Sequence, residues 1–193
     1  GDVHLLRITT RDPQPPPLDY IAVSGGIFLD MTIHDFDMAR FLVDSPVQEI
    51  FARGAVLIDP QIEQAGDFDT AVVWMRHESG AMTVIDNSRQ AAYGHDQRVE
   101  VFGSKGMVTS ENHHDHAAVV LDAEGSHGAV GPHHFWERYE SAYRHEWTAF
   151  WSYLNDGGPS PVSIEDGRAP VALAIAAGES ARSRTPIALQ GVR

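Results

Sequence analysis

The sequence contains no cysteine, and this single absence removes several classes of chemistry. Disulfide bonds, cysteine-ligated zinc, iron–sulfur clusters and thiol nucleophiles all require a thiol, so none of them can operate here. Long apolar runs are missing as well, since no stretch approaches the roughly 18 apolar residues of a membrane span. Residues 1–25 lack the charged start and the apolar stretch of a signal peptide. We therefore expect a cytoplasmic protein.

Positive charge is scarce relative to negative charge. The 193 residues include 14 lysines and arginines against 27 aspartates and glutamates, a formal net charge of −13 with neutral histidines. Such an acidic surface repels phosphate backbones and anionic lipid headgroups, which argues against nucleic acid or membrane as a partner. With 42% hydrophobic and 21% charged residues, the composition is that of a globular protein with a sizeable core.

The N-terminal part of the sequence predicts one strand and one helix. Apolar and polar residues alternate from Val3 to Arg11, as in a half-buried strand. The proline-rich stretch 12–17 excludes both a helix and strand pairing, so we expect a stiff extended crossing. After a Ser-Gly-Gly break, the segment Ile27–Val43 has the pattern of a helix.

Six short apolar runs follow between residues 47 and 121, and turn residues separate them. They are Ile50–Leu57, Phe68–His77, Ala81–Ser88, Arg98–Phe102, Met107–Ser110 and Ala117–Leu121. Spacing this tight favours antiparallel neighbours over helical crossovers, so we expect a meandering sheet.

Two helices are expected after the sheet. The segment from His133 to about Asp156 carries aromatic residues spaced by three and four. This spacing favours packing in the core over stacking against a sugar. The segment Ile164–Arg182 is rich in alanine, and Ser163 is its expected N-cap with Asp166 three residues further on.

These elements predict an α+β fold with one open, mainly antiparallel sheet and helices on one face. We interpret residues 1–193 as a single domain, because there is no internal repeat and no domain-sized linker. Several expected strands carry apolar residues at both parities, so the uncovered face of the sheet is expected to contact another subunit. A homodimer or homotetramer would result.

The helix expected at Ile27–Val43 combines an apolar surface with ionisable residues. At about 100° per residue, Asp30 and His34 lie about 40° apart on one face, where the carboxylate can contact the imidazole. The carboxylate raises the proton affinity of the imidazole and burial lowers it, which leaves a candidate general base. The alternative is an internal polar pair that holds the helix in register, and the spacing alone leaves that alternative open.

Gly25 and Gly26 directly precede this helix. A turn without side chains lets a bulky ligand approach the backbone, and the helix N-terminus favours negative charge there. The two glycines are therefore candidates for a cofactor contact.

This segment resembles the signature of the inositol 2-dehydrogenase branch of the glucose–fructose oxidoreductase (Gfo/Idh/MocA) family. The family motif is Gly-Gly-x-x-x-Asp-x-x-x-His, and its positions here are Gly25, Gly26, Asp30 and His34. The resemblance extends to nearly the whole chain. Further similar stretches are Ile33–Arg40, Asn87–Gly94, Asp96–Gly106 and Glu137–Tyr139.

The resemblance implies that NAD oxidises myo-inositol or a related cyclic polyol while His34, oriented by Asp30, removes the hydroxyl proton. Hydride leaves carbon more easily as the oxygen becomes alkoxide-like, so a base within hydrogen-bond reach lowers the barrier. By the same resemblance Tyr93 would lie near the polyol, and Tyr139 and Arg138 at the edge of the pocket.

Family members also carry a Rossmann domain and a lysine beside the histidine, which this sequence lacks. No Gly-x-Gly-x-x-Gly follows a strand, and no Glu-Lys-Pro segment is present. We therefore expect the C-terminal piece of a longer protein, inactive alone, in which an N-terminal domain binds most of the NAD. Two alternatives stay open: a domain of a related sugar or polyol dehydrogenase, and a non-catalytic module for oligomerisation.

Histidine pairs offer a further candidate chemistry. Five of the 11 histidines lie in the stretches 113–116 and 133–134. Neighbouring side chains on a strand point to opposite faces, and no His-Glu-x-x-His segment occurs, so we expect incidental surface histidines and no metal site.

Overall fold

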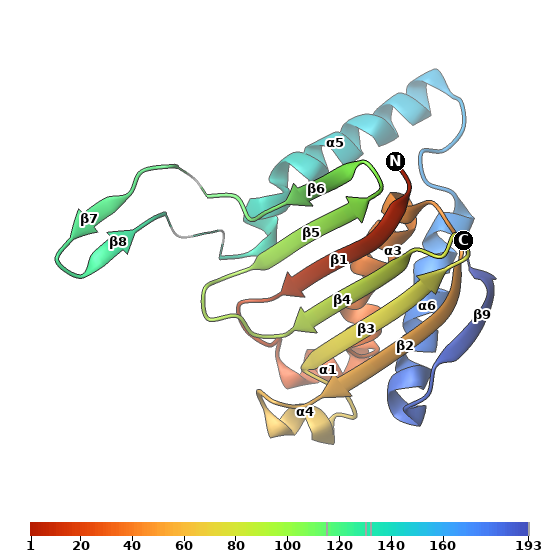
Figure 1. The fold of residues 1–193 in the computed structure, drawn as a ribbon, viewed down its shortest axis with the longest axis horizontal. Helices are drawn as coiled ribbons and strands as arrows, with labels where there is room; N and C mark the ends of the chain where they lie inside the picture. The colour runs from red at the N-terminus through yellow and green to blue at the C-terminus, as the bar shows by residue number, and fades with distance from the viewer. Residues whose placement is uncertain (115, 130, 132, 193) are drawn as a thin grey trace.

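A seven-stranded sheet forms the front of the molecule, with helices behind it (Figure 1). The computed structural model describes residues 1–114, 116–129, 131 and 133–192. The strands are β1 (Val3–Arg11), β2 (Val47–Ala55), β3 (Thr70–His77), β4 (Met82–Ser88), β5 (Asp96–Gly103), β6 (Gly106–Ser110) and β9 (Ile187–Val192). Their spatial order is β6-β5-β1-β4-β3-β2-β9. All neighbours pair antiparallel except β1 and β4, which run parallel.

The predicted open and mainly antiparallel α+β sheet is confirmed. Alternation places Leu6, Ile8 and Thr10 of β1 on the helix-covered face, with exposures of 0%, 1% and 7%. Leu6 and Ile8 belong to the same hydrophobic core as Phe36 and Leu173, which are fully buried. The intervening residues of β1 face the open side of the sheet, where no helix covers them.

The predicted helix at Ile27–Val43 is interrupted. It forms α2 (Ile27–Asp30) and α3 (Thr32–Val43), because Met31 adopts φ −115° between them. A further short helix, α1 (Leu18–Ser24), ends directly before Gly25 and Gly26. The sequence pattern also did not predict α4 (Pro60–Gln64), the second strand of the hairpin formed by β7 (Val120–Asp122) and β8 (Gly125–His127), or β9. These elements are short, so local pattern gives little signal for them.

The helix α6 (Ile164–Ser183) confirms the predicted start. Ser163 Oγ accepts from the Asp166 amide at 3.1 Å, and Asp166 Oδ2 accepts from the Ser163 amide at 2.9 Å. This reciprocal capping box satisfies two amides that the helix itself leaves without partners.

Replacing Ser163 with alanine should therefore lower the free energy of unfolding by about 1 kcal/mol. Urea denaturation followed by circular dichroism measures the change. Ser152→Ala, at an exposed position of the helix α5 (Phe135–Asp156), serves as the control and should change stability by less than about 0.5 kcal/mol. An equal loss in both variants would show that the cap contributes nothing specific.

The helix α5 (Phe135–Asp156) corrects the expectation of core packing. It has no buried residue, and Figure 1 shows it behind the edge formed by β5 and β6. Its exposed aromatic residues include Trp136, Tyr143, Trp147, Phe150 and Trp151. Helical spacing predicts that these rings share one side of a helix. It does not predict whether another part of this chain packs against them. Among the described residues, no helix is long and apolar enough to cross a bilayer.

Candidate active site

Ionisable side chains gather at one end of the sheet. Because β1 and β4 are parallel, their final residues Arg11 and Ser88 meet at the same edge, and β5 begins there opposite Arg11. The helices α1 and α4 lie at this end as well (Figure 1). The segments that leave and enter these strands therefore bring residues distant in sequence together.

A buried arginine organises the cluster. The side chain of Arg89, directly after β4, is 1% exposed. Its Nη1 donates to Asp30 Oδ2 at 2.8 Å, and its Nη2 donates to Asp67 Oδ2 at 3.0 Å. The second oxygen of Asp30 accepts from the Tyr20 hydroxyl at 2.6 Å. Both oxygens of Asp30 are thus held in place, by Arg89 and Tyr20 and not by His34.

The two glycines shape the approach to this cluster. Gly25 and Gly26 have φ values of +88° and +87°, which side chains rarely adopt. A Cβ on Gly26 would lie 2.9 Å from Asp67 Oδ1, the atom that accepts from the Ile27 amide at 2.8 Å. Gly26 is therefore required by an internal carboxylate that caps α2. A cofactor contact at the two glycines remains a prediction.

His34 stands in the first turn of α3 and is exposed on this chain. His34 acts electrostatically on Asp12, the residue after β1. Burial raises the pKa of Asp12, the nearby charge of Asp30 adds to the rise, and the charges of Arg89 and His34 oppose it. Asp30, Arg89 and His34 therefore all lie within electrostatic reach of Asp12.

Asp35, next to His34, is buried in a polar network. Its Oδ1 accepts from the Thr10 hydroxyl at 2.7 Å and from the Gln97 amide at 3.4 Å, and its Oδ2 accepts from Asn87 at 2.8 Å. Thr32 in turn donates to Asn87 at 2.7 Å. This network joins the start of α3 to β1, β4 and β5, and so fixes the position of His34 relative to the sheet.

Burial raises the pKa of Asp35 to about 6, although its three hydrogen bonds oppose the rise. Because this value lies above the ordinary 3.8, the folded state binds more protons than the unfolded state between these two pH values. Stability should therefore fall as pH rises from about 4 to about 6, by on the order of 3 kcal/mol for this group.

Asp35→Asn should remove this fall, because asparagine does not ionise. Urea unfolding at several pH values between 4 and 8 measures the difference between variant and wild type, which cancels the contributions of other carboxyl groups. Asp37→Asn is the control, since that side chain is 61% exposed on the same helix. A difference between Asp35→Asn and wild type that stays constant over this range would contradict the prediction.

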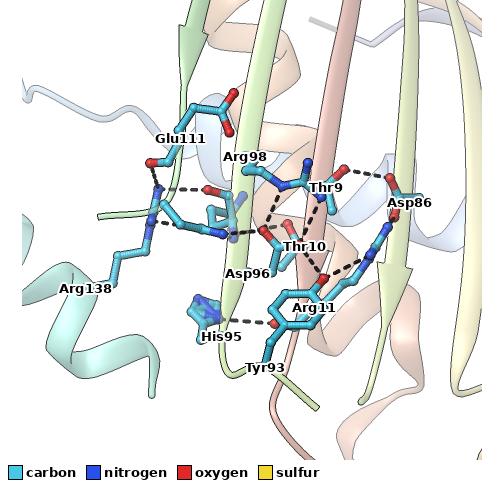
Figure 2. Close-up of polar contacts among 12 residues, drawn as sticks. Thr9, Thr10, Arg11, Asp86, Tyr93, His95, Asp96, Arg98, Glu111 and Arg138 are labelled. Carbon is cyan, nitrogen blue, oxygen red and sulfur yellow. Dashed lines mark hydrogen bonds and ion pairs between the residues drawn. The ribbon is translucent and has the colours of Figure 1, made fainter. Parts of the chain in front are cut away.

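Tyr139 reaches the same end of the sheet from α5. Its ring meets the His95 ring edge to face at 6.1 Å between centroids. Burial raises its pKa, Arg138 opposes the rise, and the charge of Asp35 adds to it. Arg138 anchors the helix, since its Nη2 donates to the Gln97 carbonyl at 2.8 Å and its Nη1 to Asn112 Oδ1 at 3.2 Å (Figure 2).

The Tyr93 hydroxyl lies on the other face of the sheet from the Asp35 network. Its hydroxyl donates to Asp96 Oδ2 at 2.7 Å and accepts from Arg11 Nη1 at 3.0 Å (Figure 2). Arg11 follows Thr10 in β1, so its side chain is on the opposite face of the sheet from the Asp35 network. The structure therefore does not bring the Tyr93 hydroxyl together with Asp30 and His34, and its role at a polyol remains a prediction.

The sequence patterns did not identify several residues of the site. Asp12 and Asp67 lie in connecting segments without a motif, and Arg89 lies in the similar stretch Asn87–Gly94, to which the resemblance gave it no role. Only the fold joins these three residues to Asp30. His95 is also new, with Nδ1 3.4 Å from the Arg11 carbonyl and 3.9 Å from Asp12 Oδ1. Of the histidine stretches, Asp115 lies outside the described residues. No group of three or more potential metal ligands gathers in the part of the chain that the structure describes.

A family model for the GFO/IDH/MocA C-terminal domain matches residues 1–109. Among curated proteins, myo-inositol 2-dehydrogenase from Thermotoga maritima is 52% identical over 192 residues, which cover 100% of this chain and 58% of that protein. The chain thus spans little more than half of the length of this relative.

Solved structures agree with the sequence comparison. A myo-inositol dehydrogenase from Corynebacterium glutamicum superposes with a TM-score of 0.92 at 41% identity, over 98% of this chain and 57% of that one. A scyllo-inositol dehydrogenase from Lactobacillus casei, with bound NAD(H) and scyllo-inositol, gives 0.86 at 27% identity, over 97% and 57%.

Proposed function

The chain belongs to the GFO/IDH/MocA family, and from this premise we propose that it is the C-terminal substrate domain of an NAD-dependent myo-inositol 2-dehydrogenase. The Thermotoga maritima relative supports the substrate, and the Lactobacillus casei structure supports NAD and an inositol as ligands. The observation that carries the proposal is the cluster at the ends of β1 and β4, where Arg89 holds Asp30 and where Asp12 lies within electrostatic reach of Asp30, Arg89 and His34. We place the enzyme in the cytoplasm.

The cluster suits a neutral polyol. Carboxylates accept hydrogen bonds from hydroxyl groups, and Asp12 and Asp30 supply two carboxylates in this cluster. We propose that the His34 imidazole accepts the proton of the reacting hydroxyl while Asp30, immobilised by Arg89 and Tyr20, fixes the electrostatic field around it. NAD, when bound, would supply the acceptor for the hydride that leaves the same carbon. We propose Tyr139, which lies near Asp35, for the rim of the polyol site. Tyr93 would contact the polyol only if its hydroxyl left Asp96 and Arg11.

The residues of this chain fit the polyol side of such a site and not the dinucleotide side. Although β1 and β4 are parallel, β1 leads into Asp12 and a proline stretch, not into a glycine-rich turn and a helix that bind pyrophosphate. We therefore propose that NAD is held mainly by another part of a longer protein, with Gly25 and Gly26 as its contacts here. The isolated chain should then be inactive.

An assay of the intact protein that contains this chain tests the proposal. With NAD and myo-inositol, NADH absorbance should rise, and the isolated 193-residue chain should give no rise. Faster turnover of glucose than of myo-inositol would instead favour a related sugar dehydrogenase. Turnover by the isolated chain would contradict the proposal that another part of the protein holds most of the NAD.

A second candidate function follows from the open face of the sheet. Val72, Met82, Phe102 and Met107 are between 42% and 57% exposed there. Exposed apolar area of this kind favours contact with another subunit, so we propose a homodimer or homotetramer. If the chain were only an assembly module, light scattering would find the oligomer while His34→Gln left the activity of the intact protein unchanged.

A further inference from the structure

One side of α5 carries large apolar side chains that nothing in the described part of this chain buries. The helix is 22 residues long, and none of them is buried. Six of its large apolar side chains are between 44% and 69% exposed and form what is termed here the aromatic face of α5: Trp136, Tyr143, Trp147, Phe150, Trp151 and Leu154. At about 100° per residue they fall within an arc of about 100°.

The size of this face indicates a partner. Aromatic side chains of this kind bury 150–250 Å² each, so the exposed part of the six amounts to on the order of 600 Å². That is the upper limit of the apolar patches on soluble monomers and the lower limit of interfaces between domains. Among the described residues, only Arg138 in the first turn ties α5 to the sheet by hydrogen bonds, and a helix without packing is marginal in water.

We propose that the aromatic face of α5 is the surface against which the NAD-holding part of the longer protein packs. The inference rests on the proposed function in one respect, namely that another part of the protein holds NAD. The chain matches the C-terminal domain of its family. Because 192 residues are 58% of the Thermotoga maritima relative, about 140 residues of that relative lie outside the match, which is the length of one ordinary domain.

The first residues of the chain lie at the end of β5 that is remote from the candidate active site. The Asp2 amide donates to Ser104 Oγ at 2.9 Å, and Ser104 is in the turn between β5 and β6. The other end of β5, at Asp96, lies at the candidate site. A domain that precedes this chain is therefore joined at one end of β5 and has to bring NAD to the other end.

The helix α5 extends between these two ends. It begins at the site, where Arg138 Nη2 donates to the Gln97 carbonyl at 2.8 Å and Tyr139 meets His95. Figure 1 shows that it then runs behind β5 toward the end of that strand where the N-terminus lies. Its 22 residues make a helix about 33 Å long. A domain of about 140 residues is roughly 35 Å across, so a domain that reaches from the N-terminus to the site lies along α5.

Photo-crosslinking in the intact protein tests this packing. Trp147 is replaced by the photoreactive residue benzoylphenylalanine, and irradiated protein is separated by mass and mapped by mass spectrometry. The expected product has the mass of one chain and joins position 147 to a peptide from the part that precedes Gly1. The matched control places the same residue at Ser141, which is exposed on the polar side of α5, and should give at least 5-fold less of this product.

Three results would overturn the proposal. A product with the mass of two chains would show that a second copy packs against α5. A crosslink from position 147 to residues 1–193 of the same chain would show that this chain covers the face itself. Equal yields from positions 147 and 141, or no product from either, would show that the face has no specific partner.

A second readout measures the consequence for NAD. Trp147→Glu should lower kcat/KM for NAD on the order of 10-fold, because loosened packing misplaces NAD relative to the polyol. Ser141→Glu should leave kcat/KM unchanged, and an unchanged value in a folded Trp147→Glu protein would contradict the proposal. If Trp147→Glu does not fold, or if the intact protein does not oxidise inositol and the proposed function fails, the crosslink still decides what packs against α5.

Discussion

Replacing His34 with glutamine is expected to lower kcat of the intact dehydrogenase by about 10²- to 10⁴-fold, the usual contribution of a general base. Glutamine retains polarity and approximate size but cannot accept the hydroxyl proton at neutral pH. KM for myo-inositol should change far less, because the proton transfer belongs to the transition state more than to binding. Steady-state NADH formation over a range of inositol concentrations separates the two parameters.

The matched control is His127→Gln, in the β7–β8 hairpin, where the histidine is half exposed. Its activity should equal that of the wild type. Thermal unfolding of both variants checks that the fold is intact, and His34→Gln should unfold normally because its side chain is exposed. A folded His34→Gln enzyme with wild-type kcat would rule out the proposed base.

Replacing Arg89 with methionine is expected to lower the free energy of unfolding by about 3–5 kcal/mol. Breaking a buried ion pair by removing one partner leaves an uncompensated charge in a site of low polarity. Here one substitution leaves both Asp30 and Asp67 without their buried cation, and the two side chains are only 15% and 6% exposed. Urea denaturation at neutral pH measures the loss.

The exposed arginine Arg76 provides the comparison. It pairs with Glu49 at 3.3 Å with 44% exposure of its side chain, so Arg76→Met should cost less than about 1 kcal/mol. Asp67→Asn combined with Arg89→Met should be less destabilising than the sum of the two single changes, because the buried charge is then halved. Equal and small losses for Arg89→Met and Arg76→Met would show that the buried pair contributes little to stability.

Local sequence pattern was sufficient to predict an element when the residues that determine it lie within the element or next to it. The alternation in Val3–Arg11 predicted β1 with its observed bounds, and Ser163 with Asp166 predicted the start of α6. Both features depend on residues within one or two turns or pleats, so tertiary contacts change them little. The break at Met31 has no such signal, since methionine is a good helix former and only packing changes its backbone.

The aromatic residues of α5 mark a different limit. Periodicity predicted a helix there, and a helix ends at Asp156 as expected. Whether a ring is buried depends on what packs against it, which spacing does not contain. The aromatic face was therefore assigned to the core, whereas the structure leaves it exposed.

The sequence by itself determined the α+β class, most of the strands and the motif that holds Asp30 and His34. The tertiary structure alone decided that Asp30 pairs with Arg89 and Tyr20, that Tyr139 joins the site, and that Tyr93 faces the other side of the sheet. The reason is that a motif fixes residues a few positions apart on one element. Partners 59 residues apart, as Asp30 and Arg89 are, meet only because β1 and β4 run parallel and end at one edge.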